Sequence, residues 1–333
     1  MNITIADLAK ITEFARSTIS GVLNNKPGFS AKTREKVLAA AEQYGYVPNE
    51  IARGLSSKYT KTIGLIIKDI TNPFYNQITK GVQEVAAENG FTVFLCSSGE
   101  EHQTEVAQVK AMMGKRVDGL IIAPLLEDVT FDHIFELKRK GLPFALLGKI
   151  PGLECDLVEF DDYSGGKQAI EHLLQNGHVK VGFISGLWSS KASKQRYMAF
   201  KDTMLQNGLQ IDPNYLFSNV KDLSDGMEIG EQLIRQKNRP TAMICFDDVI
   251  AMGVIKAFDQ AGLKVPDDLS IIGFDNIDLV IFPLTTVFIP TYKAGRALAE
   301  TLIERILNES TGEYKHITFD EELVVRSSVK NTK

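Results

Sequence analysis

The chain has 333 residues, more than one ordinary domain requires, and its length suggests two or three domains. Hydrophobic residues make up 44% and charged residues 24%, a balance that supports buried cores and excludes a disordered chain. Residues 1–61 hold six Lys, three Arg and five acidic residues, a net charge of +4, whereas the remainder holds 28 basic and 37 acidic residues, a net charge of −9. A basic head on an acidic body favours a polyanionic partner for the head alone, although an ordinary solvated surface explains so small an imbalance equally well.

The sequence shows no sign of export or membrane insertion. The chain does not begin with a basic stretch and an apolar run, and no apolar stretch approaches the roughly 20 residues that span a bilayer. The cysteines are odd in number and far apart (Cys96, Cys155 and Cys245), which favours buried thiols in a reducing cytoplasm over disulfides or zinc. The five histidines show no metal spacing. We therefore expect a cytoplasmic protein with no metal and no cofactor.

The first part of the chain predicts three short helices. Thr4 is placed to cap a first helix whose apolar face lies within residues 5–11. A four-residue break precedes a second helix, expected over residues 16–23, and the loop signal at 24–28 precedes a third helix opened by Ser30. The apolar residues of this third helix recur at helical spacing: Val37, Leu38, Ala41 and Tyr44. Two helices joined by about four residues and braced by a third form a helix-turn-helix, although many small helical bundles share this spacing.

From residue 63 onward the pattern changes to short Val/Ile/Leu/Phe-rich strands that alternate with helices. The strands are expected at Ile63–Ile67, Phe91–Leu95, Gly119–Ala123, Phe144–Leu147, Val181–Ile184, Ala242–Phe246 and Ser270–Phe274. This alternation indicates parallel sheets covered by helices on both faces. Two packed α/β units are favoured over one very large sheet. A last helix over about Lys293–Leu307 and a strand at His316–Phe319 are expected to return to the first unit.

Several motifs follow one another in a specific order. They are Thr4-Ile-Ala-Asp-Leu-Ala, Ser17-Thr18-Ile19-Ser20-Gly-Val-Leu-Asn24, Thr33-Arg34-Glu-Lys-Val37, and Gly45-Tyr-Val-Pro-Asn49 with Ala52-Arg53 and Leu55. Together, and over nearly the whole chain, this pattern resembles the LacI/GalR family of bacterial transcriptional repressors. The resemblance implies an all-α helix-turn-helix DNA-binding domain at 1–46, a hinge helix and linker at 47–60, and a two-lobed α/β sensor domain like the sugar-binding periplasmic proteins. The family's chain crosses between the lobes three times, which implies an N-terminal lobe of 61–160 plus about 290–318 and a C-terminal lobe of 161–289 plus about 319–330.

DNA contacts are expected from the head and the linker. In a helix-turn-helix the N-terminal end of the second helix enters the major groove, where Arg16, Ser17 and Thr18 form a donor-rich row suited to base edges and phosphates. The resemblance implies that the segment from Pro48 is a hinge helix that packs against its dimer mate in the minor groove, with Leu55 as an apolar wedge. Alone this helix is too short to be stable, so we expect it to order mainly on DNA. The full expected set is Thr4, Arg16, Ser17, Thr18, Ser20, Asn24, Asn49, Ala52 and Leu55.

Three residues of the head depart from the family's usual pattern. Glu13 stands where glycine would relieve a left-handed backbone, a strain of roughly 1–2 kcal/mol. Ala15 lacks the capping oxygen of the usual serine, worth about 1 kcal/mol. Gly21 replaces an arginine that in many members reads guanine. We expect the recognised DNA sequence to differ from the family's common one at that position.

Polar and aromatic side chains follow several of the predicted strands. In open α/β sheets ligands bind beyond the carboxyl ends of the strands, and carboxylates, an arginine, hydroxyls and aromatic rings in one cleft are typical of a carbohydrate site. The resemblance implies that Arg196, Asp247 and Asp275 contact an effector. The expected effector-binding set is Asn72, Phe74, Tyr75, Lys149, Trp188, Ser190, Arg196, Phe246, Asp247 and Asp275.

Some of these positions have an ordinary structural explanation. Asp248 could cap the helix that follows it, Asn72 with Pro73 could simply begin a helix, and Phe246 and Phe274 could be core residues. Gly148 and Ala123 offer no polar atoms where several relatives do. This gap suggests a smaller or anionic effector as a hypothesis, because Lys149 and Arg196 together would suit a phosphate.

Two other function classes are weaker. An enzyme would need a nucleotide cradle or a catalytic constellation, and neither Gly-x-Gly-x-x-Gly after a strand nor Gly-x4-Gly-Lys-Ser/Thr occurs. A transport protein would need export and would lack the head. We therefore predict a ligand-responsive transcriptional repressor that binds a near-palindromic operator in double-stranded DNA as a homodimer, with a sugar or sugar derivative as its small-molecule effector. The sequence leaves open whether that effector is an inducer or a corepressor.

Overall fold

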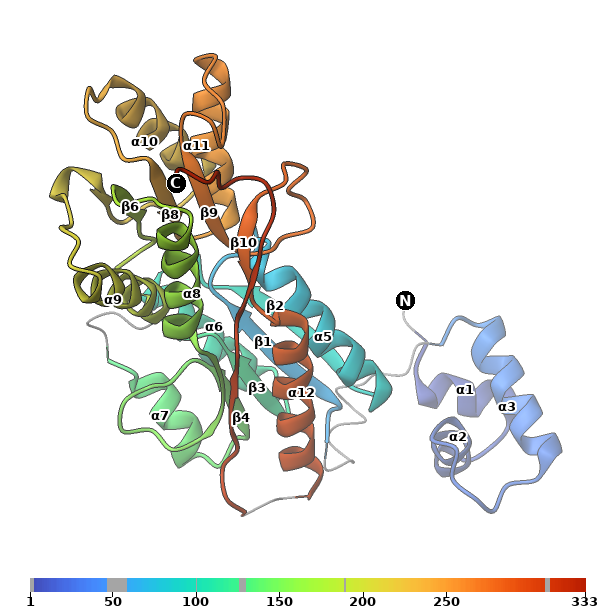
Figure 1. Ribbon diagram of the computed structural model, residues 1–333. Helices are drawn as coiled ribbons and strands as arrows, with labels where there is room; N and C mark the ends of the chain where they lie inside the picture. Colours follow the sequence, from blue (N-terminus) through green and yellow to red (C-terminus); the bar gives the residue numbers. More distant parts are fainter. Residues whose placement is uncertain (1–2, 47–58, 100, 126–129, 189, 309–311) are drawn as a thin grey trace. The chain divides into compact units, whose positions relative to one another are not determined.

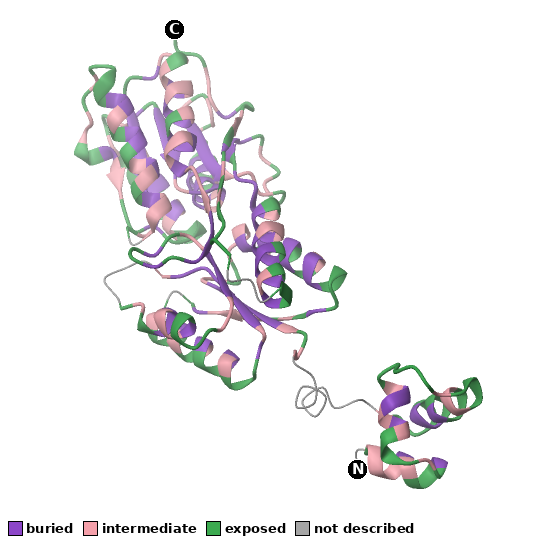
Figure 2. Cartoon of the chain, turned by 90° about the horizontal axis from the view of Figure 1, so that it is seen from below, coloured by how far each residue is buried: buried purple, intermediate pink, exposed green. Residues whose placement is uncertain are grey.

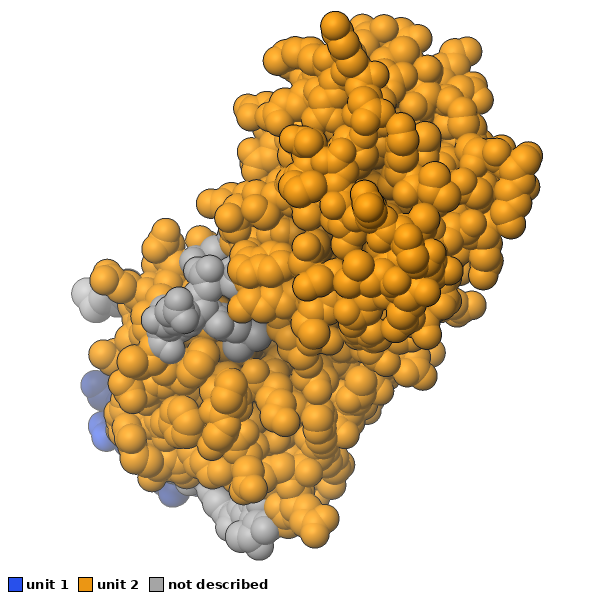
Figure 3. Space-filling model, turned by 60° about the vertical axis from the view of Figure 1, so that its left-hand side comes forward, with its two compact units in different colours: residues 1–60 blue, residues 61–333 orange. Residues whose placement is uncertain are grey.

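The computed structural model describes residues 3–46, 59–99, 101–125, 130–188, 190–308 and 312–333. Residues 1–60 and 61–333 form two compact units, shown in separate colours in Figure 3. None of the helices in the described part of the chain is long and apolar enough to cross a membrane. Burial is concentrated on the strands and on the helix faces that cover them (Figure 2).

The first unit contains the three helices that the sequence predicts. They are α1 (Ile5–Thr12), α2 (Arg16–Leu23) and α3 (Ala31–Gln43). Thr4 and Asp7 form a capping box at the start of α1, and Ser30 caps α3 by accepting a hydrogen bond from the backbone N–H of Thr33. The expected apolar face of α3 is partly wrong, because Leu38 and Tyr44 are 52% and 44% exposed. The buried residues of α3 are instead Val37, Ala40 and Ala41, which join those of α1 and α2 in a small core.

The second unit contains two parallel-rich sheets (Figure 1). The strands of the first sheet are β1 (Thr62–Ile67), β2 (Thr92–Ser97), β3 (Gly119–Ile122), β4 (Phe144–Leu147), β5 (Asp156–Phe160) and β11 (His316–Phe319). Their order is β11-β5-β4-β3-β1-β2, and every described pair is parallel. The helices that cover this sheet are α5 (Phe74–Glu88), α6 (His102–Gly114), α7 (Asp132–Arg139) and α12 (Thr291–Asn308). Successive residues of a strand point to opposite faces of the sheet, so these helices lie on two different faces. In β3, Leu120 packs with α6 and α7, and the adjacent Gly119 faces α12.

The second sheet repeats this architecture. Its strands are β6 (Val181–Ile184), β7 (Leu216–Phe217), β8 (Ala242–Cys245), β9 (Ser270–Asp275), β10 (Thr285–Phe288) and β12 (Glu322–Val324). Their order is β12-β10-β9-β8-β6-β7, and β12 alone among the described strands of this sheet runs antiparallel to its neighbour. The covering helices are α8 (Asp162–Gln175), α9 (Lys191–Gln206), α10 (Leu223–Arg235) and α11 (Asp248–Gln260). The first two pack on one face and the last two on the other.

The chain passes between the two sheets three times. It leaves the first sheet after β5 to form α8, returns from β10 to α12, and leaves again between β11 and β12. Strand β11 pairs with β5, and α12 packs along α5 and the first sheet. The first and third crossings follow neighbouring strands, so their backbones start out side by side.

All three cysteines are free thiols. Cys155 and Cys245 are buried and Cys96 is half-buried. Burial raises the pKa of each thiol, which leaves them as unreactive packing residues.

Candidate functional site

One cavity of about 500 Å³ lies between the carboxyl ends of the strands of both sheets in the unit of residues 61–333. Such edges are where open α/β sheets bind ligands, and the volume is in the usual range for small-molecule sites. Eight of the ten predicted effector-binding residues line this cavity. The eight are Asn72, Phe74, Tyr75, Ser190, Arg196, Phe246, Asp247 and Asp275.

Lys149 and Trp188 are not among the residues that line this cavity. Gly148 does line it, in a left-handed conformation with φ 106°, and the next side chain, that of Lys149, is exposed. Trp188 is 42% exposed, and its ring packs edge-on against Tyr197 with the ring centroids 5.3 Å apart. The structure therefore does not bring Lys149 together with Arg196 into the phosphate site that the sequence suggested.

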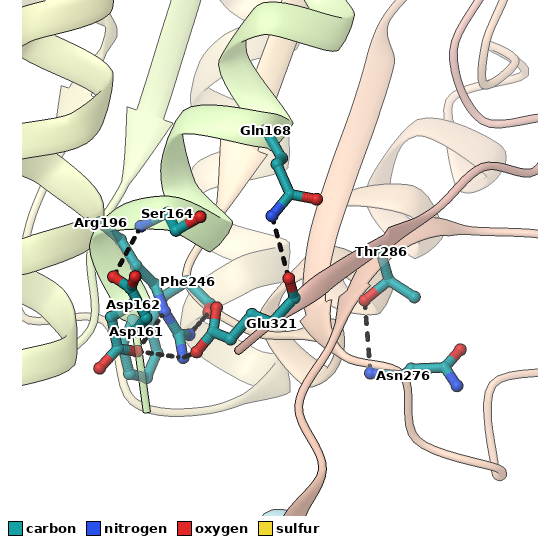
Figure 4. Close-up of polar contacts among 9 residues, drawn as sticks. All are labelled: Asp161, Asp162, Ser164, Gln168, Arg196, Phe246, Asn276, Thr286 and Glu321. Atoms are coloured by element: carbon teal, nitrogen blue, oxygen red, sulfur yellow. Dashed lines mark hydrogen bonds and ion pairs between the residues drawn. The ribbon is translucent and has the colours of Figure 1, made fainter. Parts of the chain in front are cut away.

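Arg196 of α9 is only 3% exposed and its hydrogen bonds are directed into the protein (Figure 4). Its Nε and Nη2 donate to Oδ1 of Asp162 at 3.0 and 2.8 Å, and Nη1 donates to the carbonyl of Phe246 at 2.6 Å. The guanidinium carbon lies 4.9 Å from the ring centroid of Phe246 and 4.2 Å from that of Phe274. Burial opposes the charge, but the neighbouring acids, Asp162 foremost, outweigh it and raise the pKa of Arg196. Arg196 thus shapes the cavity floor, with most of its donors already in use.

The structure decides the role of two neighbouring aspartates. Asp247, not Asp248, caps α11: its Oδ1 accepts the N–H of Ile250 at 2.8 Å. Asp248 faces the other way, where Oδ2 accepts the N–H of Ile277 at 3.0 Å and Oδ1 accepts the hydroxyl of Thr286 at 2.6 Å. Capping therefore does not explain Asp248, which braces the turn after β9.

That turn holds Asp275 in an unusual conformation. Asp275 and Asn276 have φ values of 96° and 52°, a left-handed backbone that costs non-glycine residues free energy. The N–H of Ile277 donates to Asp248, and Arg326 donates to the side chain of Asn276 at 2.6 Å. The N–H of Asn276 donates to the hydroxyl oxygen of Thr286 at 3.4 Å (Figure 4). These bonds stabilise the strained turn and place Asp275 at the cavity.

The cavity floor is rich in buried carboxyl groups. Burial raises the pKa of Asp247 to about 6 and that of Asp248 to about 7, and it raises the pKa of Asp275 well above its ordinary value. The nearby guanidinium of Arg196 lowers the pKa of both Asp247 and Asp275 but does not cancel the effect of burial. A carboxyl with a pKa of about 6, such as that of Asp247, accepts hydrogen bonds when ionised and donates one when protonated, which suits a ligand that carries hydroxyl groups.

Aromatic side chains also line the cavity. The ring of Phe74 contacts those of Tyr75 and Phe160 edge-to-face, with centroids 5.1 and 6.0 Å away. Asn72 lines the cavity, and its Oδ1 accepts the N–H of Phe74 at 2.9 Å. It is not the N-cap that the sequence suggested, because α5 begins at Phe74 and Pro73 occupies the N-cap position. Phe246 lines the cavity as well, whereas the fully buried Phe274 belongs to the core.

Several charged residues of the cavity were absent from the predicted set. They are Lys68, Asp69, Glu101, Glu159, Asp162, Lys191 and Lys221, and His102 lines the cavity as well. Glu159 of β5 and Lys191 of α9 form an ion pair at 2.6 Å between elements of the two sheets. Burial opposes ionisation of Glu159, but hydrogen bonds from Lys191 and His316 outweigh burial and lower its pKa. In the described ranges no group of three or more His, Cys, Asp or Glu side chains is placed to hold a metal ion.

The head presents part of the predicted DNA-binding set at the start of α2. Arg16 and Ser17 are exposed, and Thr18 and Ser20 are partly exposed. Two of the predicted residues, Thr4 and Asn24, form hydrogen bonds with neighbouring residues of the head. Thr4 donates its hydroxyl to Asp7 at 2.6 Å within the capping box, and the Asn24 amide donates to the Ser20 carbonyl at 2.8 Å. The predicted hinge residues Asn49, Ala52 and Leu55 lie outside the described residues.

The three unusual residues of the head have visible consequences. Glu13 adopts the expected left-handed conformation with φ 63°, and Ala15 begins α2 without a side-chain hydrogen bond. Gly21 is buried, and a Cβ placed on it would lie 2.5 Å from the ring of Phe29. The ring of Phe29 therefore occupies the space that the first atom of a side chain at position 21 would need.

Both units match known protein profiles. Residues 4–49 match bacterial regulatory proteins of the lacI family, and residues 60–326 match the periplasmic binding proteins and sugar binding domain of the LacI family. The chain belongs to the LacI family. The predicted fold class, a helix-turn-helix head with a periplasmic-binding-protein-like α/β sensor, is confirmed for this LacI-family chain. So is the predicted function: the protein is a ligand-responsive transcriptional repressor.

Individual LacI-family proteins are similar along their full length. The chain is 34% identical to the HTH-type transcriptional repressor PurR of Photobacterium profundum, with 98% of this chain and 99% of the relative covered. A lac repressor dimer bound to operator and the anti-inducer ONPF has the same fold, with a TM-score of 0.85 at 24% identity over 99% of this chain and 100% of that one. A complex of the transcriptional regulator CelR with cellobiose has a TM-score of 0.73 at 25% identity, over 98% of this chain and 100% of that one.

Proposed function

We propose that the cavity binds a neutral, hydroxyl-rich effector, a sugar or sugar derivative, and that its occupancy controls DNA binding by the head. The observation that carries this proposal is the pairing of two carboxyls, those of the buried Asp247 and the half-buried Asp275, with the rings of Phe74 and Phe246 around one cavity. Carboxyls hold ligand hydroxyls while flat rings cover the apolar faces of a sugar. The cellobiose complex of a related regulator supports this assignment.

The charges at the cavity floor argue against an anionic effector bound there. Lys149 is outside the cavity lining, and the shortest bonds of Arg196 go to Asp162 and to the Phe246 carbonyl. Lys191 is paired with Glu159. A phosphate at the floor would face Asp247 and Asp275, which repel it unless both are protonated. A neutral ligand avoids this repulsion.

The DNA side of the proposal rests on the head. Arg16, Ser17 and Thr18 at the start of α2 read the major groove, supported by Thr4, Ser20 and Asn24, while Asn49, Ala52 and Leu55 act in the minor groove. We assign residues 1–46 to DNA binding and 47–60 to the hinge and linker. The sensor lobes are 61–160 plus about 290–318, and 161–289 plus about 319–330. The protein acts in the cytoplasm as a homodimer on two half-sites, without catalysis, in keeping with the operator-bound dimer of the lac repressor.

Effector binding then acts through lobe closure. The cavity takes residues from both lobes, and the ion pair of Glu159 with Lys191 joins a strand of the first sheet to a helix on the second. A ligand that binds one degree of closure more tightly shifts the population toward it and so biases the hinge segments. The same geometry is compatible with an effector that weakens DNA binding (an inducer) and with one that strengthens it (a corepressor).

A thermal-shift screen of the full chain tests the effector class. Neutral sugars, their phosphorylated counterparts and nucleobases are added to the wild type, to Asp275→Asn and to Asp278→Asn, whose exposed carboxyl does not line the cavity. We expect a neutral sugar to raise the melting temperature of the wild type and of Asp278→Asn, and to have a much smaller effect on Asp275→Asn. Stabilisation by phosphorylated sugars alone, or equal stabilisation of all three proteins, would contradict the proposal.

A further inference from the structure

Two of the three inter-sheet crossings begin side by side. Strands β5 and β11 are paired in parallel, and just beyond them the N–H of Asp161 donates to the carbonyl of Phe319 at 3.0 Å. Each crossing then places a carboxyl next to Arg196, Asp162 from the first and Glu321 from the third (Figure 4). The two acids therefore join both crossings to one buried cation at the cavity floor.

Glu321 lies in a setting that disfavours a carboxylate. It is 4% exposed, and neither of its side-chain oxygens has a hydrogen-bond partner among the described residues. Its Oε1 is 4.0 Å from Nη2 of Arg196, whereas Asp162 holds the same nitrogen at 2.8 Å. A Cβ on Gly165 would lie 1.9 Å from Oε2, so α8 packs directly onto the carboxyl group. The backbone carbonyl of Glu321 accepts from Gln168 of α8 at 2.9 Å, which fixes its position.

The charges around Glu321 are mostly negative. Asp161 and Asp162 face it from the start of α8 and Asp275 from the end of β9, while Arg196 of α9 is the cation within reach. Asp247 and Asp248, at the start of α11, raise the pKa of Asp275 in turn. Burying a carboxylate without a hydrogen-bond donor costs free energy. A cation that is already bonded to one carboxylate offsets the cost of burying a second one only weakly. Burial, opposed by Arg196 and reinforced by Asp162, raises the pKa of Glu321 to about 8.

We propose that Glu321 is a positioning residue that carries a proton at neutral pH and donates it to Asp162, tying the two crossings and Arg196 into one hydrogen-bonded unit beneath the cavity. The proton satisfies a buried oxygen that otherwise has no partner and removes one negative charge from the cluster. Alkaline pH releases it and loosens the floor. The consequence for effector binding rests on the proposed function of the cavity, but the protonation and the bond to Asp162 do not.

Urea unfolding of the full chain between pH 6 and pH 8 tests the protonation. Trp188 is the one tryptophan of the chain, so its fluorescence follows the unit of residues 61–333. Folded Glu321 keeps its proton up to about pH 8, whereas an unfolded glutamate loses it near 4.3, so this residue makes the wild type less stable as pH rises through that window. Glu321→Gln keeps a donor and has no proton to lose. We expect the ratio of wild-type to Glu321→Gln unfolding constants to rise roughly 50-fold from pH 6 to pH 8.

Two further variants make the result decisive. Glu322→Gln changes the adjacent, exposed carboxyl and should leave the ratio flat. Glu321→Met keeps the length of the side chain without a donor, and we expect it to unfold more readily than Glu321→Gln at both pH values, because Asp162 loses a bond. A flat ratio for Glu321→Gln, with this variant less stable than the wild type throughout, would show an ionised Glu321 paired with Arg196 and would overturn the protonation. Equal stability of Glu321→Met and Glu321→Gln would overturn the positioning role. Failure of the sugar screen would leave all of these outcomes unchanged.

Discussion

Glu13 shows how a single residue limits the stability of the head. It follows α1 with φ 63°, a left-handed conformation that costs a non-glycine residue roughly 1–2 kcal/mol. The next helix begins at Ala15, which has no side-chain oxygen for a cap. Both features were predicted from the resemblance to the LacI/GalR family, whose usual pattern has glycine and serine at these two positions.

Replacing Glu13 by glycine should therefore stabilise the head. Glycine adopts the left-handed conformation freely, and after allowance for its greater freedom in the unfolded chain we expect a gain of up to about 1 kcal/mol. Amide hydrogen exchange of α1 and α2 in the full chain measures this gain as slower exchange. Glu35→Gly, the same change at an exposed helical position of α3, should instead cost about 1 kcal/mol. Faster exchange in Glu13→Gly would show that the left-handed backbone is not the source of strain.

Asp248 matters through the turn that it braces. Asp248→Ala leaves the N–H of Ile277 and the hydroxyl of Thr286 without their acceptor, and we expect a loss of about 1–3 kcal/mol in the free energy of unfolding. Asp278→Ala, at an exposed position in the following segment, should change it by less than about 0.5 kcal/mol. Urea unfolding compares the two. Equal effects would mean that the turn holds Asp275 without help from Asp248.

At the residue scale the sequence identified positions better than partners. Arg196 was predicted and lies at the cavity, but its main partner, Asp162, follows β5, a strand that the sequence analysis did not predict. Glu321 follows β11, a strand that was predicted. Its place just after a strand could therefore have marked it as a candidate site residue. Lys149 was expected at the cavity because it stands beside Gly148, a position where several relatives have a polar side chain. The left-handed backbone at Gly148 depends on tertiary structure, and the sequence pattern does not predict it.

At the scale of elements, glycines set the distance between α10 and α11. A Cβ on Gly253 would lie 2.3 Å from the carbonyl oxygen of Leu223, and one on Gly226 would lie 2.4 Å from that of Ile250. Backbone atoms cannot move aside as a side chain can. The two helices can approach this closely only because both carry glycine at the contact.

Gly253→Ala should force the helices apart. We expect a loss of about 1–3 kcal/mol, as is usual for overpacking, although alanine is the better helix former. Gly114→Ala near the end of α6, where a Cβ would meet no atom within 4 Å, should not destabilise the protein and should gain up to about 1 kcal/mol. Thermal unfolding of the two variants gives the comparison. A stable Gly253→Ala protein would contradict the close packing.

Most of the predicted strands were those with a continuous apolar run. All eight predicted strands are present: seven are the unbroken stretches of Val, Ile, Leu and Phe that are typical of buried parallel strands, and the eighth is β11. Four short strands were not predicted: β5, β7, β10 and β12. Strand β5 contains Asp156 and Glu159, β7 and β12 have two and three residues, and β10 begins with two threonines. They exist because neighbouring strands and crossings hold them, which is tertiary information.

At the scale of the whole molecule, the two units divide the chemistry between them. Each has its own core, and the basic residues of the head stand in contrast to the acidic body. The body holds a cavity at the strand ends of two sheets, and the chain crosses three times between them. A ligand held there can bias the relation of the two lobes, which is what a repressor needs from its sensor.

The most direct test of the account is selection of DNA by the full chain from a pool of random duplexes at moderate salt. We expect enrichment of one near-palindromic sequence, with two half-sites related by two-fold symmetry, and no enrichment by residues 61–333 alone. Ser17→Ala and Thr18→Ala should alter the enriched half-site at the bases that α2 contacts. Enrichment of the same sequence by residues 61–333, or no enrichment by the full chain, would contradict the assignment of DNA binding to the head.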